Sequence, residues 1–209
     1  MCSRTSSRSR TGRPRSAEAD AAILDATRAA LVELGWSKLT MGDVATRAGV
    51  AKTTLYRRWA SKNELVVDAV AVLFDELELP DRGSLAADIE GVVRQFAALL
   101  ERPEAKTALM AVVAESTRDE PLRQRIRASI VERQKRLVLQ GRRRAQERGE
   151  LPPPAPDSGP SSGTDDLIFD VVAGAVVHRA LVSAEPVDAD WAQRFTALLL
   201  GGLAAATQG

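Results

Sequence analysis

The sequence contains few aromatic side chains, one cysteine and one histidine. Aromatic residues make up 4% of the 209 positions, the cysteine is Cys2 and the histidine is His178. A lone cysteine excludes an internal disulfide, and together with one histidine it offers no metal-ligand cluster. A lone histidine also leaves no obvious catalytic triad, and there is no glycine-rich phosphate loop. The sequence therefore favours a protein that is not an enzyme and that holds no metal ion or cofactor.

Long apolar runs are absent as well. No run approaches the ~20 residues needed to span a bilayer, and the N-terminus lacks the apolar core of a secretory signal. Clusters of aromatic and β-branched residues, which favour strands, are scarce, whereas alanine, leucine, valine and arginine are abundant. We therefore expect an all-α, cytoplasmic protein that makes no contact with a membrane.

Charge is distributed unevenly, although the net charge is only +1. Residues 1–64 carry 12 positive and 6 negative charges, whereas residues 65–209 carry 17 positive and 22 negative charges. A basic N-terminal third on an acidic remainder is typical of a DNA-binding head on a body that avoids phosphate. Residues 1–15 hold five arginines and no acid, which predicts a disordered basic arm. The arm is either an electrostatic aid to DNA binding or a solubilising tail, and its place beside the head favours the first.

The stretch 39–65, LTMGDVATRAGVAKTTLYRRWASKNEL, has the pattern of two short helices joined by a tight turn. Thr40 can cap the first helix, and Asp43 three residues later can complete a capping box. Gly49 can adopt the left-handed conformation that ends this helix. Residues 52–59 then form a short basic second helix. Helix, glycine turn and short basic helix make a helix-turn-helix, whose second helix enters the major groove of DNA.

At these residues the chain resembles the TetR family of bacterial transcriptional repressors. The shared features are the threonine cap, the Ala-Gly-Val turn, Leu-Tyr in the second helix, an aromatic residue at its end and Ser-Lys at the start of the next helix. The resemblance is densest over about a quarter of the chain. It implies a three-helix DNA-binding domain, residues 16–62, followed by a larger helical ligand-binding and dimerisation domain, residues 63–209, with about nine helices in all.

The resemblance also implies which residues contact DNA. Those expected at phosphate are Thr40, the backbone of Gly42, Tyr56 and Lys62. Those expected to read base edges are Lys52, Thr53, Thr54 and Arg57, with Arg58 suited to either role. Lysine or arginine can bind a guanine edge, and a threonine methyl can contact a thymine methyl.

One position departs from the family pattern. Many members have serine or threonine where this chain has Ala51, so the second helix lacks a side-chain cap. Loss of a cap costs about 1 kcal/mol, and we expect full order of this helix only on DNA. Leu55 and Trp59 are expected in the core, as is Trp36.

Helical spacing of apolar residues predicts the remaining helices. Ser61 and Glu64 offer a second capping box for a long helix that links the head to the second domain. The helix at 103–116 is nearly all apolar and should be well buried, whereas 149–163, GELPPPAPDSGPSSG, predicts a flexible loop. Three arginines at 142–144 are either a nucleic-acid contact or a solvated helix end, and the helix dipole favours the second. The predicted helices cover residues 18–34, 65–79, 84–101, 103–116, 122–148, 165–184 and 188–207.

The last two predicted helices are apolar around most of their circumference, and helices of this kind do not stay exposed. Burial within one subunit is one explanation. The family resemblance implies the other, which we favour: the two helices pair with their symmetry mates to form a homodimer.

The resemblance further implies a small-molecule effector bound among the helices of the second domain. The candidate contacts are larger side chains on small-residue helices, each of which is more often plain core: Phe74, Phe96, Met110, Phe169 and His178. The function favoured by the sequence is a homodimeric repressor that binds a palindromic DNA operator and is released by its ligand. The alternative is a ligand-independent regulator, or an activator, whose second domain only dimerises.

Overall fold

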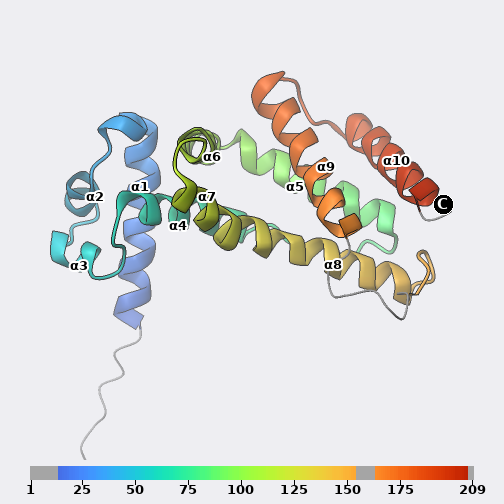
Figure 1. Ribbon diagram of the computed structural model, residues 1–209, viewed down its shortest axis with the longest axis horizontal. Coiled ribbons are helices and arrows are strands. Elements are labelled where there is room, and N and C mark those ends of the chain that lie inside the picture. The colour runs from blue at the N-terminus through green and yellow to red at the C-terminus, as the bar shows by residue number, and fades with distance from the viewer. Residues whose placement is uncertain (1–13, 154–162, 207–209) are drawn as a thin grey trace, which may run out of the picture.

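The computed structural model describes residues 14–153 and 163–206 (Figure 1). Every regular element in these ranges is helical, which confirms the predicted all-α class. The helices are α1 (Pro14–Lys38), α2 (Met41–Arg47), α3 (Lys52–Tyr56), α4 (Lys62–Phe74), α5 (Leu85–Glu101), α6 (Pro103–Ser116), α7 (Glu120–Ile126), α8 (Glu132–Glu147), α9 (Gly163–Val177) and α10 (Ala189–Ala206). A π-helical turn, Arg127–Val131, joins α7 to α8 in one rod, and another, His178–Val182, extends α9. Counted as rods, the described residues form nine helices, as predicted.

The helices separate into a head, α1–α3, and a body, α5–α10, with α4 between them (Figure 1). Helix α1 packs on α2 within the head and also on α4 and α6, so the head is fastened to the body by more than one helix. In the body, α5 packs against α6, α8, α9 and α10. One cluster of buried apolar side chains runs from the head through α4 into the body. Helix α4 contributes to both ends of this cluster and therefore packs in the head and in the body.

Several predicted helix boundaries were wrong. Helix α1 begins at Pro14 rather than near Glu18, so the part of the predicted arm that remains, residues 1–13, lies outside the described residues. Most of the predicted 149–163 loop, residues 154–162, lies outside them as well. Gly35 ends the regular part of α1 as predicted, with a φ of 73° that favours glycine.

Helices α3 and α4 are both shorter than predicted. Helix α3 ends at Tyr56 instead of residue 59, because the chain tightens there and turns Trp59 into the core. Helix α4 ends at Phe74 instead of residue 79. Tighter bonds from Glu76 N–H to Leu73 O and from Leu77 N–H to Phe74 O end the helix. Pro80 disfavours a helical conformation at Leu79, which lies in the wall of a cavity.

Two other expectations about α4 and α6 also need correction. The Ser61 side chain accepts from the backbone N–H of Glu64, but the Glu64 carboxylate accepts from Ala60, so the capping box is not reciprocal. Helix α6 is buried on only one side, where it covers α1 and α4. On its other side Met110 and Val113 are 44% and 46% exposed. The helix is therefore less buried than its apolar composition predicted.

Within the described residues, no helix combines the length and the apolar character that crossing a membrane requires.

Candidate nucleic-acid interface and internal cavity

The start of α2 is fixed by the predicted capping box. The Thr40 hydroxyl accepts from the Asp43 backbone N–H at 3.2 Å, and the Asp43 carboxylate accepts from the Thr40 N–H at 3.0 Å and from its hydroxyl at 2.6 Å. Hydrogen bonds from the Thr40 side chain, and then from its backbone, lower the pKa of Asp43. Asp43 is therefore ionised at neutral pH and holds the exposed Thr40 at the start of α2.

Helix α3 presents a polar face to solvent on the outer side of the head (Figure 1). Lys52, Thr53, Tyr56 and Arg57 are exposed, and Thr54 is half-buried. The opposite face is apolar: as predicted, Leu55 and Trp59 are buried. Ala51 makes no side-chain hydrogen bond to the start of the helix, because its methyl group has no polar atom. A helix of five residues without a cap depends on its packing for stability.

The structure brings Lys52 and Gly42 together. A Cβ atom added to Gly42 would lie 2.8 Å from Cε and 2.9 Å from Nζ of Lys52. The lysine side chain therefore lies across the start of α2, where any larger residue would displace it. Two residues that the sequence predicts to contact DNA thus form one surface.

Arg58 and Lys62, which are also predicted DNA contacts, bind groups within the head. The Arg58 guanidinium is 19% exposed and its Nε lies 2.7 Å from the Asp20 carboxylate on α1. Lys62 Nζ donates to the Trp36 carbonyl oxygen at 2.9 Å and lies 5.0 Å from the centre of the Trp36 ring. Both side chains fasten the segment around α3 to α1, a role that the sequence pattern did not reveal.

A partly buried hydrogen-bond chain connects the end of the helix-turn-helix to the body. The Trp59 Nε1–H donates to one Asp68 carboxylate oxygen at 2.9 Å, and Arg125 Nη2 donates to the other oxygen at 3.0 Å. Beside this chain, Asn63 of α4 donates to Asp119, which caps α7, at 2.7 Å. The three groups Trp59, Asp68 and Arg125, which we call the joint, link the end of the helix-turn-helix to α4 and α7.

A cavity of about 430 Å³, partly open to solvent, lies in the body between α4, α5, α8, α9 and α10. Its walls are mainly aliphatic, and Phe74, Phe96 and Phe169 are among them, so three of the five predicted pocket residues come together. Met110 and His178 are not in the wall. Met110 lies on the exposed side of α6, and His178 lies at an exposed π-helical turn, with its Nδ1 3.4 Å from the Ser183 hydroxyl. A mainly apolar wall with a few polar groups is typical of a small-molecule site.

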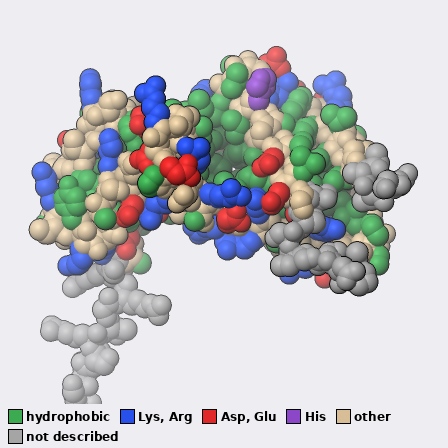
Figure 2. Space-filling model, viewed as in Figure 1, with side chains coloured by type: hydrophobic (Ala, Val, Ile, Leu, Met, Phe, Trp, Pro, Cys, Tyr) green, Lys and Arg blue, Asp and Glu red, His purple; other side chains and the backbone are tan. Residues whose placement is uncertain are grey.

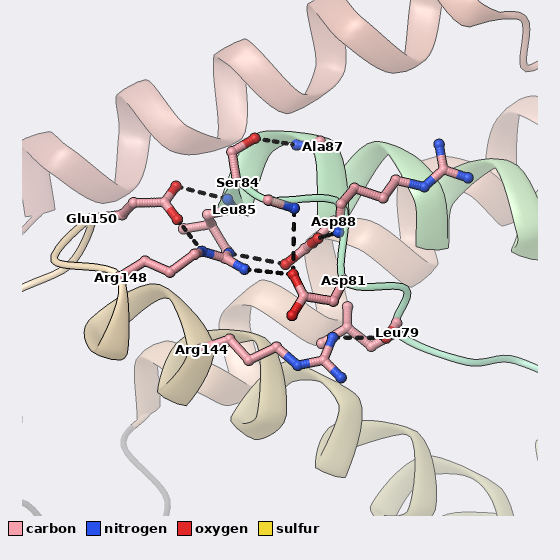
Figure 3. Close-up of polar contacts among 11 residues, drawn as sticks. Leu79, Asp81, Ser84, Leu85, Ala87, Asp88, Arg144, Arg148 and Glu150 are labelled. Atoms are coloured by element: carbon pink, nitrogen blue, oxygen red, sulfur yellow. Dashed lines mark hydrogen bonds and ion pairs between the residues drawn. The ribbon is translucent and has the colours of Figure 1, made fainter.

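One end of the cavity is closed by ion pairs between α5, the 79–85 segment and the end of α8 (Figure 3). Arg148 binds the carboxylates of Asp81, Asp88 and Glu150, and the fully buried Asp88 also accepts from the Arg82 backbone N–H at 2.7 Å. The Leu85 backbone N–H, and then Arg148, lower the pKa of Glu150. Bonds to Glu150 and Asp88 raise the pKa of Arg148. Sequence analysis missed this cluster because its members are far apart in the chain.

Two family models match the chain. One, for bacterial regulatory proteins of the tetR family, matches residues 23–69, which hold the capping box and α3. The other, a tetracyclin repressor-like C-terminal domain, matches residues 79–199, which hold the cavity. The chain belongs to the TetR family. It is therefore a DNA-binding transcriptional regulator of the helix-turn-helix type and not an enzyme, which confirms both sequence predictions.

Individual relatives match most of this chain and most of their own length. The uncharacterized HTH-type transcriptional regulator YdeS of Bacillus subtilis is 28% identical over 183 residues, 86% of this chain and 87% of that protein. The crystal structure of the TetR family regulator SCO0332 is 31% identical, covers 88% of this chain and 98% of that one, and superposes with a TM-score of 0.69. FadR of Bacillus subtilis, solved in complex with stearoyl-CoA, shares the fold at 17% identity and a TM-score of 0.63, over 87% of this chain and 98% of that one.

The missing cap on α3 leads to a test of head stability. Ala51→Ser supplies a hydroxyl to the start of α3, and we expect it to raise the free energy of unfolding by about 1 kcal/mol. The matched control is Ala98→Ser at an exposed position inside α5, where serine costs about 0.5 kcal/mol. Urea unfolding followed by circular dichroism measures both. Equal effects of the two substitutions would show that α3 gains nothing from a cap.

Proposed function

We propose that this regulator is a homodimeric repressor that binds a palindromic operator and releases it when a small molecule fills the cavity. The observation that carries the proposal is the apolar cavity, about 430 Å³ in volume, into which α4 places Phe74. The volume lies within the range of small-molecule sites, roughly 300–1,000 Å³. A regulator that only dimerises has no need of such a space, which argues against the ligand-independent alternative. The stearoyl-CoA complex of FadR supports the proposal at the level of the shared fold.

Dimerisation is supported by the apolar surface of the last two helices. Leu198 on α10 is 77% exposed, and Leu167 and Val171 on α9 are exposed as well. Figure 2 shows hydrophobic side chains over this part of the body. Gly174 and Gly201 have open space where a side chain would stand, so a second copy can approach α9 and α10 closely. A two-fold dimer presents two α3 helices and requires a near-palindromic operator with half-sites about 34–36 Å apart or a multiple of it.

The DNA contacts follow from exposure and the family pattern. Lys52, Thr53, Thr54 and Arg57 read base edges from α3, while Thr40, the backbone of Gly42 and Tyr56 bind phosphate. Lys62 holds Trp36 with one N–H and retains others for phosphate. Arg58, paired with Asp20, acts chiefly by holding α3 in place.

The joint is the route by which an occupied cavity releases DNA. Ile130 lies in the cavity wall and also in the π-helical turn that comes shortly after Arg125. On the other side, α4 runs from the joint at Asp68 to Phe74 in the same wall. A ligand that separates Ile130 from Phe74 therefore moves Arg125 away from Asp68, shifts Asp68 on α4, and so changes the position of Trp59 at the end of the helix-turn-helix.

The dimer and its operator are tested together. Light scattering of the purified protein should give twice the chain mass, and footprinting on the DNA upstream of its own gene should give paired protected half-sites that a compound from a panel abolishes. Leu198→Glu should yield a folded monomer without a footprint, because charges buried at a two-fold interface cost several kcal/mol. The control is Val113→Glu on α6, which should remain a dimer. A dimeric Leu198→Glu protein, or protection that survives every compound, would contradict the proposal.

Base reading and phosphate binding have different expected signatures. Lys52→Ala should change the ranking of operator variants, because each specific base contact contributes about 1–3 kcal/mol of discrimination. Tyr56→Phe should weaken binding to all variants alike, by about 1 kcal/mol for one hydrogen bond. Competition binding at fixed salt against single-base operator variants distinguishes these results. An unchanged ranking with Lys52→Ala would refute the assignment of Lys52 to a base.

The joint is tested by Arg125→Met. With a compound that releases the wild-type protein, the ratio of operator affinities without and with compound should fall by about 5-fold or more, since coupling energies are about 1–3 kcal/mol. Binding of the compound should change little, because Arg125 is not in the cavity wall. Arg123→Met, an exposed change on the same helix, is the control. Full coupling in Arg125→Met would exclude the joint as the route.

A further inference from the structure

Among the described residues, a single uncharged polar side chain lines the cavity. Gln134 of α8 is 9% exposed, and its Nε2 donates to the Phe74 carbonyl oxygen at 2.9 Å. That carbonyl belongs to the last turn of α4, where backbone acceptors lack partners in the helix. Only the nitrogen of an amide can donate to a carbonyl oxygen. The orientation of the Gln134 amide is therefore fixed.

The other atom of this amide, Oε1, is an acceptor that receives no hydrogen bond from the part of the chain that the structure describes, although it belongs to a side chain that is more than nine-tenths buried. Oε1 itself is not sealed from the cavity, so solvent can satisfy it until a ligand fills the space. A ligand that excludes solvent without donating a hydrogen bond then leaves this acceptor unpaired, at a cost of about 1–3 kcal/mol. Since Gln134 lies in the cavity wall, the partner that removes this cost is a donor group on the ligand.

The charged side chains that the structure describes in the wall are all paired within the protein. Asp88 and Glu150 bind Arg148 and backbone N–H groups of the 82–85 segment, and Asp165 binds Arg142 at 2.9 Å. An anionic ligand would have to displace one of these carboxylates from its arginine. A cationic ligand would have to draw a carboxylate away from its arginine. Neither finds a counter-ion already available, and burying an unpaired charge is far more costly than burying a neutral donor.

The two kinds of polar group lie at different ends of the cavity. Gln134 and Arg142 are eight residues apart on α8, which corresponds to roughly 12 Å along the helix. Phe74 and Phe96, whose ring centres are 5.7 Å apart, line the cavity with Gln134, and the wall toward Arg142 is mainly aliphatic. A ligand anchored at Gln134 therefore extends its apolar part toward the charged end without needing to reach it.

We propose that the effector is an uncharged, mainly apolar molecule that donates one hydrogen bond to Oε1 of Gln134. The assignment rests on the proposed function, in which the cavity holds the effector. Its chemical class is that of phenols, alcohols and neutral amides with a hydrophobic body. The class excludes carboxylates, acyl thioesters of highly charged carriers and quaternary or primary ammonium compounds.

The test uses four probes that share a biphenyl body: para-phenylphenol, its methyl ether, para-phenylbenzoate and para-phenylbenzylammonium. Isothermal titration calorimetry on the full chain should show the phenol binding roughly 3- to 10-fold more tightly than the ether, the value of one hydrogen bond. The benzoate and the ammonium probe should bind on the order of 100-fold more weakly than the phenol or not at all.

Substitution of the acceptor completes the test. In Gln134→Met, which keeps the length of the side chain, the phenol and the ether should bind with equal affinity. Continued binding of the ether shows that the variant is folded. Gln140→Met, on the same helix but outside the cavity wall, should keep the preference for the phenol. If Gln134→Met does not fold, the order of the four probe affinities for the wild-type protein tests the neutral-donor assignment.

The outcomes separate this inference from the proposed function. A charged probe that binds best, or an ether that equals the phenol in the wild-type protein, overturns the neutral-donor assignment even where a panel compound releases the operator. The neutral-donor assignment is also overturned if none of the four probes binds although a panel compound releases the operator. If the phenol preference depends on Gln134 but no compound releases DNA, the ligand assignment is upheld and the repressor mechanism fails.

Discussion

Asp68 is the group on which the connection between the two ends of the molecule depends. Its two carboxylate oxygens accept from Trp59 of the head and Arg125 of the body, at 2.9 and 3.0 Å. A partly buried carboxylate that loses one such partner keeps the cost of its own desolvation. The position of α4, the end of the helix-turn-helix and the start of the α7–α8 rod are therefore determined together. The head is oriented by a polar contact in a molecule whose other contacts between head and body are mainly apolar.

Of the helices of the head, α3 depends most on packing against its neighbours for its stability. It has five residues, no side-chain cap and one fully buried side chain, Leu55. Helices this short are not stable alone, so α3 is held by two residues that come after it in the chain: Trp59 in the core and Arg58 on Asp20. An element that depends on its neighbours responds to their movement. The same weakness that makes α3 dependent on Trp59 also makes it sensitive to the joint.

The sequence predicted the features that local chemistry determines. The capping box at Thr40, the turn at Gly49, the all-α class and the order of the helices depend on patterns a few residues long, and they agree with the structure. Tertiary contacts determined the features that the sequence did not reveal. The ends of α3 and α4 depend on where the next residues pack, and the one-sided burial of α6 depends on which helices cover it. Of the predicted pocket residues, only the three phenylalanines line the cavity, because residue size alone does not indicate which side of a helix faces it.

The two ends of the cavity differ in how readily they can move. At the far end, Arg148 joins Asp81, Asp88 and Glu150, and Arg144 donates to the Leu79 carbonyl oxygen, so α5, α8 and the segment between α4 and α5 are tied together (Figure 3). At the near end the wall includes a π-helical turn, an interruption of the α-helical hydrogen-bond pattern of a kind that is frequent at functional sites. In the proposed mechanism, a ligand that fills the space between the two ends displaces the end that fewer ion pairs hold, where Arg133 binds Asp75. That end adjoins Arg125, so under this proposal the ion pairs at the far end direct the effect of binding toward the head.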